Sequence, residues 1–181
     1  MTEAVIDTRA RERFPLAWWG VAMLVATEGA LFALLIASYF YLRFKNHPWP
    51  PRGIPEPKLV VPLVMLGVLV LTALPMWRAV VSATPRRWLL LALLVQAGYF
   101  AMEVHLYTDD LHHFTPQQHA YGSLYYTLLG ASHGHVAVGL LFDLWLLLRP
   151  KAVRAIALYW YAVIALTVAV TLTVLSPAFA R

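Results

Sequence analysis

The chain has 181 residues, of which 61% are hydrophobic and 13% are charged, and a soluble domain of this length could not bury so much apolar surface. The composition therefore predicts an integral membrane protein, and the absence of cysteine excludes disulfides, thiolate metal sites and thiol catalysis. The formal net charge of +5 comes from short basic clusters between apolar runs, a pattern typical of membrane topology signals and not of a nucleic-acid-binding surface.

Five apolar spans follow one another along the chain, at approximately 18–42, 59–81, 88–107, 121–148 and 155–175. Each has the roughly 20 residues that a membrane-spanning helix needs. The spans are too long for the strands of a membrane β-barrel and lack the two-residue alternation of such strands. The sequence predicts an all-α fold: one polytopic membrane domain over 1–181, built as a bundle of five transmembrane helices.

The distribution of lysine and arginine predicts the orientation of the bundle. With the N-terminus inside, the inner segments hold nine basic residues: Arg9, Arg11, Arg13, Arg78, Arg86, Arg87, Arg149, Lys151 and Arg154. The outer segments then hold five: Arg43, Lys45, Arg52, Lys58 and Arg181. Because basic residues favour the inner side, we expect the N-terminus inside and the C-terminus outside.

The first span contains a single acid, Glu28, at a depth of about 15 Å from the start of the span. Phe32 and Tyr39 follow on the same helical face. A carboxyl group at this depth is either a neutral group hydrogen-bonded to a neighbouring helix or a proton-handling or partner-contact group, and both interpretations stay open. The next segment, NHPWPPRGIPEPK, has five prolines and predicts an extended, stiff loop on the outer side.

The third span ends with Glu103 and His105, close to the predicted outer interface, where they could be interfacial anchors. The loop that we expect to follow, 108–118, and the residue after it hold side chains that bind transition metals: Asp109, Asp110, His112, His113 and His119. Their spacing does not enforce one ligand geometry, so we expect no metal site in this chain.

The fourth span carries most of the polar residues of the apolar runs. His133 and His135 are two positions apart, which places them about 200° apart on a helix, so they cannot both bind one metal. Ser132, His135, Gly139 and Asp143 share one broad helical face, and Gly130 with Gly134 makes a small-xxx-small step. Close packing with hydrogen bonds between helices explains these residues. We expect an interhelical polar seam of Ser132, His133, Gly130, Gly134, Gly139 and Asp143.

These residues resemble subunit III of the haem–copper oxidases, the cytochrome c oxidase group. Four segments carry the resemblance in order: TEGALFALLIASYF (27–40), WPPRGIP (49–55), QAGYFAME (96–103) and Y-G-S-x-Y-Y-x-x-x-G-x-x-x-x-H-V-x-x-G (121–139). The last segment is similar, without a gap, to the most distinctive helix of the family. Together the four cover most of the chain.

The chain also departs from the family pattern. The long form of the family has seven spanning helices, whereas this chain resembles the last five, as in a shorter bacterial form. Ser132 stands where the family usually has histidine. In the last span the family's Trp-His-Phe-x-Asp pattern is replaced by Trp160, Tyr161, Ala162, Val163 and Ile164.

The resemblance implies a non-catalytic subunit in a prokaryotic cytoplasmic (inner) membrane, with no redox centre of its own. Such a subunit packs on subunit I of a complex that also contains subunit II, with haem and copper in those partners. It would bind phospholipid and support proton uptake. Glu28 matches the family's buried carbodiimide-reactive glutamate, Glu103 the acid at the helix end, and His135 the histidine of the fourth helix.

Other functions stay open at this point. One is a subunit-III-like accessory protein of a nitric oxide reductase, which shares the five-helix form. Another is a small proton or solute transporter in which Glu28, His133, His135 and Asp143 form a relay. Against the transporter, the sequence shows no broken helix and no inverted repeat. A membrane haem protein is disfavoured because the histidines supply no ligand pair on one helix.

Overall fold

A computed structural model describes residues 16–55, 57–149 and 152–179 of the chain. These residues form six helices and no strand: α2 (Leu16–Lys45), α3 (Val60–Leu71), α4 (Ala73–Val81), α5 (Pro85–His113), α6 (Ala120–Leu148) and α7 (Val153–Phe179). Since α3 and α4 follow each other along one line, the described helices provide five segments long and apolar enough to cross a membrane. The predicted all-α fold with five spans is confirmed.

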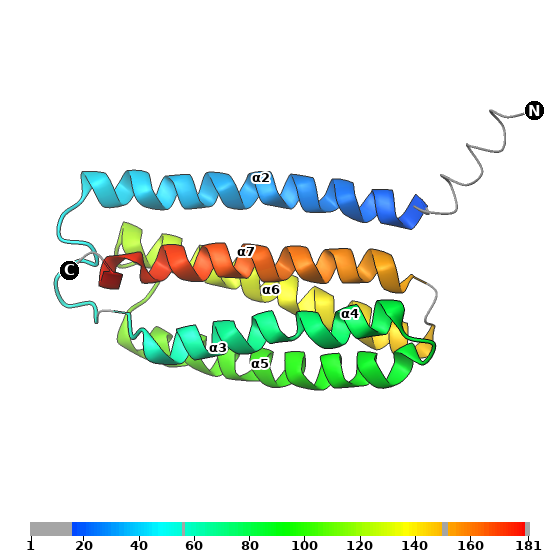
Figure 1. Cartoon of the computed structure of the whole chain (residues 1–181). Helices are drawn as coiled ribbons and strands as arrows, with labels where there is room; N and C mark the ends of the chain where they lie inside the picture. Colours follow the sequence, from blue (N-terminus) through cyan, green and yellow to red (C-terminus); the bar gives the residue numbers. More distant parts are fainter. Residues whose placement is uncertain (1–15, 56, 150–151, 180–181) are drawn as a thin grey trace, which may run out of the picture.

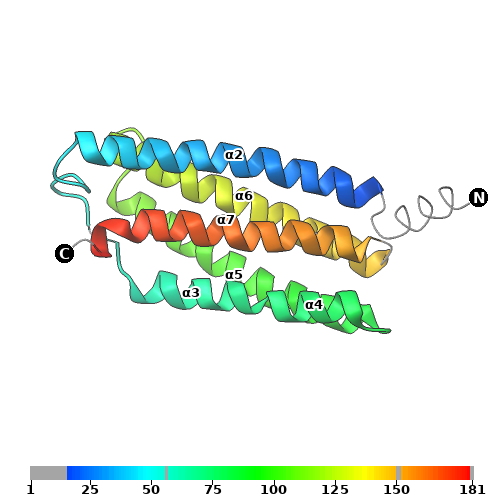
Figure 2. The same cartoon turned by 45° about the horizontal axis from the view of Figure 1, so that its top comes forward.

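The five spans lie side by side along a common axis (Figures 1 and 2). Helix α7 is central in the bundle. In its most apolar stretch of 18 residues, 44% of the residues are buried, whereas only 6% are buried in the corresponding stretch of α2. Helix α2 covers one side of the bundle, and its Arg43 donates a hydrogen bond of 2.6 Å from Nη1 to Oγ of Ser176 on α7. Most of the apolar surface of α2 therefore faces away from the protein, as expected for an integral membrane protein.

The orientation of the bundle stays a prediction. Helix α2 begins at one end of the bundle and α7 finishes at the other, as an odd number of spans requires (Figure 1). Several basic residues on which the prediction depends lie outside the described residues: Arg9, Arg11, Arg13, Lys151 and Arg181.

The second span is interrupted at Thr72, so the prediction of an unbroken helix there is wrong. Pro75 explains the interruption, since proline has no N–H to donate to the carbonyl of Leu71 and its ring crowds that carbonyl. The Thr72 hydroxyl donates to the Leu69 carbonyl at 2.5 Å and accepts a hydrogen bond of 2.8 Å from Nε1 of Trp160. The chain continues in the same direction after the break, so α3 and α4 act as one span (Figure 1).

Helix α5 runs to His113, six residues beyond the apolar run at 88–107. The helix continues because backbone hydrogen bonds do not require apolar side chains, and the amide of Phe114 still donates to the carbonyl of Asp110. Asp109, Asp110, His112 and His113 therefore lie on the last turns of a helix. The predicted loop at 108–118 is therefore wrong for residues 108–113.

Two clusters of buried side chains form the interior. One lies around Trp160 and includes Met76, Leu89 and Leu146, in the half of the bundle that contains α4. The other lies toward the end where α2 finishes and is rich in aromatic rings, among them Phe32, Tyr39, Phe114, Tyr121 and Tyr126. Helix α6 passes through both clusters, so it connects a largely aliphatic half to an aromatic half.

Candidate functional site

The two histidines of α6 each meet a carboxyl group from a different helix. Nε2 of His135 lies 3.2 Å from Oε2 of Glu28 on α2, and Nε2 of His133 lies 3.1 Å from Oε2 of Glu103 on α5. The histidines point to opposite sides because two residues correspond to about 200° of helical rotation. Three spans are therefore joined by two acid–histidine pairs.

The contacts of His135 restrict how protons can be arranged in the Glu28–His135 pair. Nδ1 of His135 lies 2.7 Å from the carbonyl oxygen of Ala131, which can only accept, so Nδ1 carries a proton. Nε2 then meets the Glu28 oxygen, and the contact is favourable only when one further proton lies on either Nε2 or the carboxyl group. The pair can thus hold one exchangeable proton without net charge inside the span.

Two aromatic side chains lie beside the Glu28–His135 pair. The Phe32 ring packs edge-on against the imidazole, with ring centroids 5.3 Å apart. The Tyr159 hydroxyl of α7 donates to the backbone carbonyl of His135 at 3.1 Å. The side chains of Glu28 and His135 remain 28% and 22% exposed in the isolated chain.

The Glu103–His133 pair is more enclosed, with side-chain exposures of 16% and 12%. The ring of Tyr107, one turn after Glu103, lies edge-on to the His133 imidazole with ring centroids 5.4 Å apart. His105 is exposed. Glu103 therefore contacts α6, and a role of Glu103 and His105 as interfacial anchors stays a prediction.

The segment from Asp109 to His119 contains residue types that can bind metals. Within the described part of the chain, no three His, Asp or Glu side chains gather in a way that could hold a metal ion. Asp110 instead accepts a short hydrogen bond from the hydroxyl of Tyr125, and Nδ1 of His113 bonds the backbone carbonyl of Asp109.

Ser132 connects α6 to α7 at the centre of the bundle. Its hydroxyl lies 2.9 Å from the hydroxyl of Thr167, and both residues are buried. Each hydroxyl can be donor or acceptor, so the two satisfy each other without any charged group. Ser132 thus stands in a packed interface between two helices.

The three glycines in the middle of α6 have different environments. A Cβ added at Gly139 would lie 2.7 Å from Cζ3 of Trp160, closer than atoms can approach. A Cβ at Gly130 would lie 3.3 Å from the Tyr107 hydroxyl oxygen, whereas nothing lies within 4 Å of one at Gly134. At Gly139, α6 and α7 therefore pack so closely that no side chain fits between them.

Asp143 is fully buried in the half of α6 that follows Gly139. Its polar neighbour is Gln96 of α5, which is also fully buried. Neither carboxyl oxygen of Asp143 and neither polar atom of Gln96 makes a hydrogen bond of normal geometry with a described residue. Buried polar atoms without such bonds are rare, so this pair is an unusual polar spot in an apolar interface.

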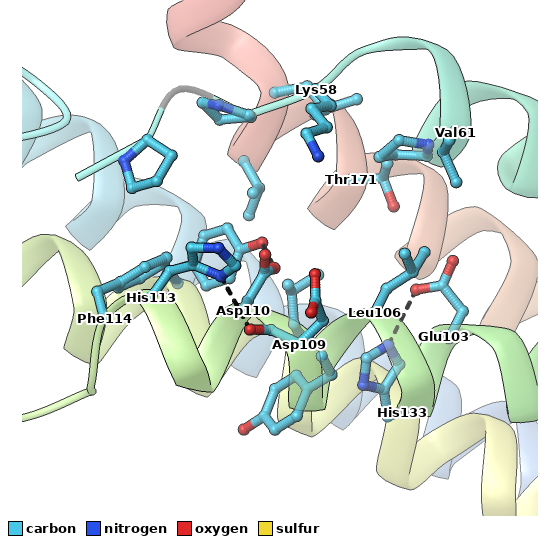
Figure 3. Close-up of a pocket in the computed structure, with 18 of the residues that line it drawn as sticks. Lys58, Val61, Glu103, Leu106, Asp109, Asp110, His113, Phe114, His133 and Thr171 are labelled. Atoms are coloured by element: carbon cyan, nitrogen blue, oxygen red, sulfur yellow. Dashed lines mark hydrogen bonds and ion pairs between the residues drawn. The ribbon is translucent and has the colours of Figure 1, made fainter.

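A cavity of about 220 Å³ opens beside the Glu103–His133 pair (Figure 3). Its walls come from the proline-rich loop, the start of α3, the last turns of α5, and parts of α6 and α7. Asp109, Asp110, His113 and Lys58 also line it, so we call it the acidic cavity. Of the site residues predicted from the sequence, only Glu103 and His133 contribute to this cavity.

Several buried polar residues of the spans are absent from the sequence-based prediction of the site. Gln96, Thr167 and Thr72 are buried polar residues inside apolar spans. The rule applied to Glu28, that a polar group inside a span has a partner or a function, would have selected them as well. The position of Trp160 between Thr72 and Gly139 required the tertiary structure.

Known proteins resemble this chain over most of its length. It is 31% identical over 167 residues to a probable cytochrome c oxidase subunit 3 of Nocardia farcinica, a match covering 80% of this chain and 79% of that protein. It is 29% identical over 150 residues to cytochrome c oxidase subunit 3 of Bacillus subtilis, with 77% and 70% covered. A third relative, the same subunit of Synechocystis, is 27% identical over 173 residues, with 82% and 70% covered. No family model matches the chain.

Proposed function

This chain belongs to the cytochrome c oxidase subunit III family, and we propose that it is a non-catalytic subunit of a membrane-bound terminal oxidase that reduces oxygen and pumps protons. The observation that carries the proposal is the match to several proteins of that name at 27–31% identity over about four fifths of the chain. Five apolar spans fit an integral membrane subunit of such a complex.

We propose that its partners are oxidase subunits I and II, with haem and copper held by those partners, in the cytoplasmic membrane of a prokaryote. The apolar outer surface of α2 supports a packing role, since large side chains such as Met23, Leu34 and Phe44 are more than 70% exposed there. Lipid or another subunit must cover such a surface.

The acid–histidine pairs are the groups that we propose for proton handling. Glu28 and His135 together can hold one exchangeable proton, shared between the carboxyl group and Nε2, which suits a group that handles protons. Glu103 and His133 form a similar pair beside a polar cavity. We also propose that the chain binds phospholipid.

Affinity purification through a tag on this chain tests the assignment. We expect oxidase subunits I and II to copurify, with the haem spectrum of the oxidase in the eluate. Copurification with a nitric oxide reductase, or purification of the chain alone from mild detergent, would contradict the proposal.

Deletion of the gene for this chain tests its role within the complex. We expect the remaining oxidase to retain its haem spectrum and initial oxygen consumption but to lose activity during sustained turnover. Full activity throughout prolonged turnover would contradict the supporting role. Complementation with the intact gene serves as the control.

A further inference from the structure

Asp143 of α6 and Gln96 of α5 are neighbours in the interior of the bundle. Both side chains are fully buried, and they come from two helices that pack against each other. All four of their polar side-chain atoms lack a hydrogen bond of normal geometry to any described residue. Buried polar atoms of this kind are rare in folded proteins, so the two residues need a joint explanation.

The helix turns on either side of the two residues are buried and carry no charged group. Ala92 and Tyr99, one turn before and one turn after Gln96, are at most 3% exposed. On α6, Leu146 lies one turn after Asp143 and is fully buried. An ionised carboxylate in such surroundings loses its hydration, so it is far more costly to bury than a neutral carboxylic acid.

No basic side chain among the described residues compensates for a charge on Asp143. Neither of the ion pairs described above includes it. The buried tyrosines of the neighbouring helices have other partners, since the Tyr159 hydroxyl donates to the carbonyl of His135 and the Tyr99 hydroxyl lies near Glu103. A proton is the simplest way to remove a charge that no described cation compensates. The described arginines at this end of the bundle are all exposed: Arg78, Arg86, Arg87, Arg149 and Arg154.

The number of donors and acceptors leads to the same result. An ionised Asp143 has only acceptors, and Gln96 has one acceptor oxygen and one NH2 group, so Oε1 of Gln96 would have no donor. A protonated Asp143 supplies this donor: its hydroxyl donates to Oε1 of Gln96, while its carbonyl oxygen accepts from Nε2. All four polar atoms are then satisfied. The terminal torsions of both side chains have broad preferences, so the two groups can turn to meet each other.

We propose that Asp143 and Gln96 form a buried proton-binding site, in which a neutral carboxylic acid and a carboxamide share two hydrogen bonds between α6 and α5. The ligand is one proton, which converts the carboxylate into the acid, and no other group changes its charge. The site is separate from the Glu28–His135 pair, because Asp143 lies eight residues after His135, about 12 Å along the helix. It does not depend on the proposed oxidase function, since both residues belong to this chain.

Infrared difference spectroscopy of the purified full-length chain tests the protonation state. The spectrum of Asp143→Asn is subtracted from that of the unsubstituted chain at neutral pH. We expect the difference to contain the C=O stretching band of a carboxylic acid, at a frequency lowered by hydrogen bonding, and no carboxylate band. Asp109→Asn changes an exposed aspartate of α5 and is the matched control. It should remove a carboxylate band instead, because an exposed aspartate is ionised at neutral pH.

Gln96→Leu tests whether the amide is the partner of the acid. Leucine neither donates nor accepts a hydrogen bond, so the carboxylic acid band of Asp143 should persist and move to higher frequency. A purely structural role of Asp143 would not produce this shift. The first test does not depend on the folding of Gln96→Leu, because Asp143→Asn keeps two hydrogen bonds as an amide–amide pair and should unfold at nearly the same midpoint as the unsubstituted chain.

Unfolding midpoints in mixed SDS micelles provide a second measurement of the pairing. Asp143→Leu alone leaves Gln96 buried without a partner and should lower the midpoint. The double variant Asp143→Leu, Gln96→Leu should recover part of this loss, because both polar groups are then removed together.

Three results would overturn the proposal. One is the loss of a carboxylate band, in place of an acid band, in Asp143→Asn at neutral pH. Another is an acid band that Gln96→Leu leaves at the same frequency. The third is a double variant whose unfolding midpoint is no higher than that of Asp143→Leu.

Discussion

Helix α6 passes through two regions in which polar groups have different surroundings. Around Trp160, the Gly139 backbone and the Thr72 hydroxyl are in direct contact with the indole, and the residues are fully or almost fully buried. Around the acidic cavity, carboxyl and imidazole groups border an open space. The difference indicates that polar residues serve packing in the first region and are available to ligands or protons in the second.

The packed region should be the most sensitive to added volume. Gly139→Ala places a methyl group 2.7 Å from the Trp160 ring, and we expect a loss of about 1–3 kcal/mol in the free energy of unfolding. Equilibrium unfolding in mixed SDS micelles, followed by tryptophan fluorescence, measures this loss.

Gly134→Ala is the matched control on the same helix, because nothing lies within 4 Å of its added Cβ. We expect Gly134→Ala to be neutral or to stabilise by up to about 1 kcal/mol through helix propensity. Equal destabilisation by the two substitutions would contradict the contrast between a packed and an open position on α6.

A smaller effect is expected at the hydroxyl pair that joins α6 to α7. Ser132→Ala and Thr167→Val each remove one partner of the 2.9 Å contact. In a double-mutant cycle with the same unfolding assay, we expect a coupling energy of about 0.6 kcal/mol and no more than about 1.7 kcal/mol. Additive effects of the two substitutions would show that the hydroxyl contact does not contribute.

The smallest effect on stability is expected at the acid–histidine pairs. Glu28→Gln and Glu103→Gln keep the shape and a hydrogen bond, and both side chains are partly exposed, so we expect changes below about 0.5 kcal/mol. In the assembled oxidase, Glu28→Gln should lower proton uptake or speed inactivation during turnover, because an amide cannot take up the exchangeable proton.

Glu103→Gln provides the comparison for Glu28→Gln, since it alters the pair beside the acidic cavity. Oxygen consumption and proton uptake are measured for both variants at matched assembly. If Glu28→Gln leaves both rates and the inactivation time unchanged, Glu28 is a packing group.

Much of the fold follows from local sequence patterns. The five spans, the all-α class and the opposite directions of His133 and His135 depend only on run length and helical periodicity, which act within one segment. The helix ends were harder to predict: α5 continues through Asp109 and His113, because backbone hydrogen bonds extend past the apolar run.

Partners between segments could not be predicted from those patterns. The sequence selected Glu28, Glu103, Ser132, His133 and His135 as residues that need an explanation, since each puts a polar group into an apolar span. It could not predict that Glu28 meets His135 while Glu103 meets His133, because that choice depends on which helices are neighbours and how each is rotated.

The sequence by itself determined that this is a five-span membrane protein, with a pattern similar to oxidase subunit III, because hydrophobicity and periodicity are properties of contiguous residues. Only the tertiary structure decided that the break at Thr72 meets Trp160, why Gly139 must lack a side chain, and which loop closes the acidic cavity. These features join residues far apart in the chain, and they arise from close packing of whole helices.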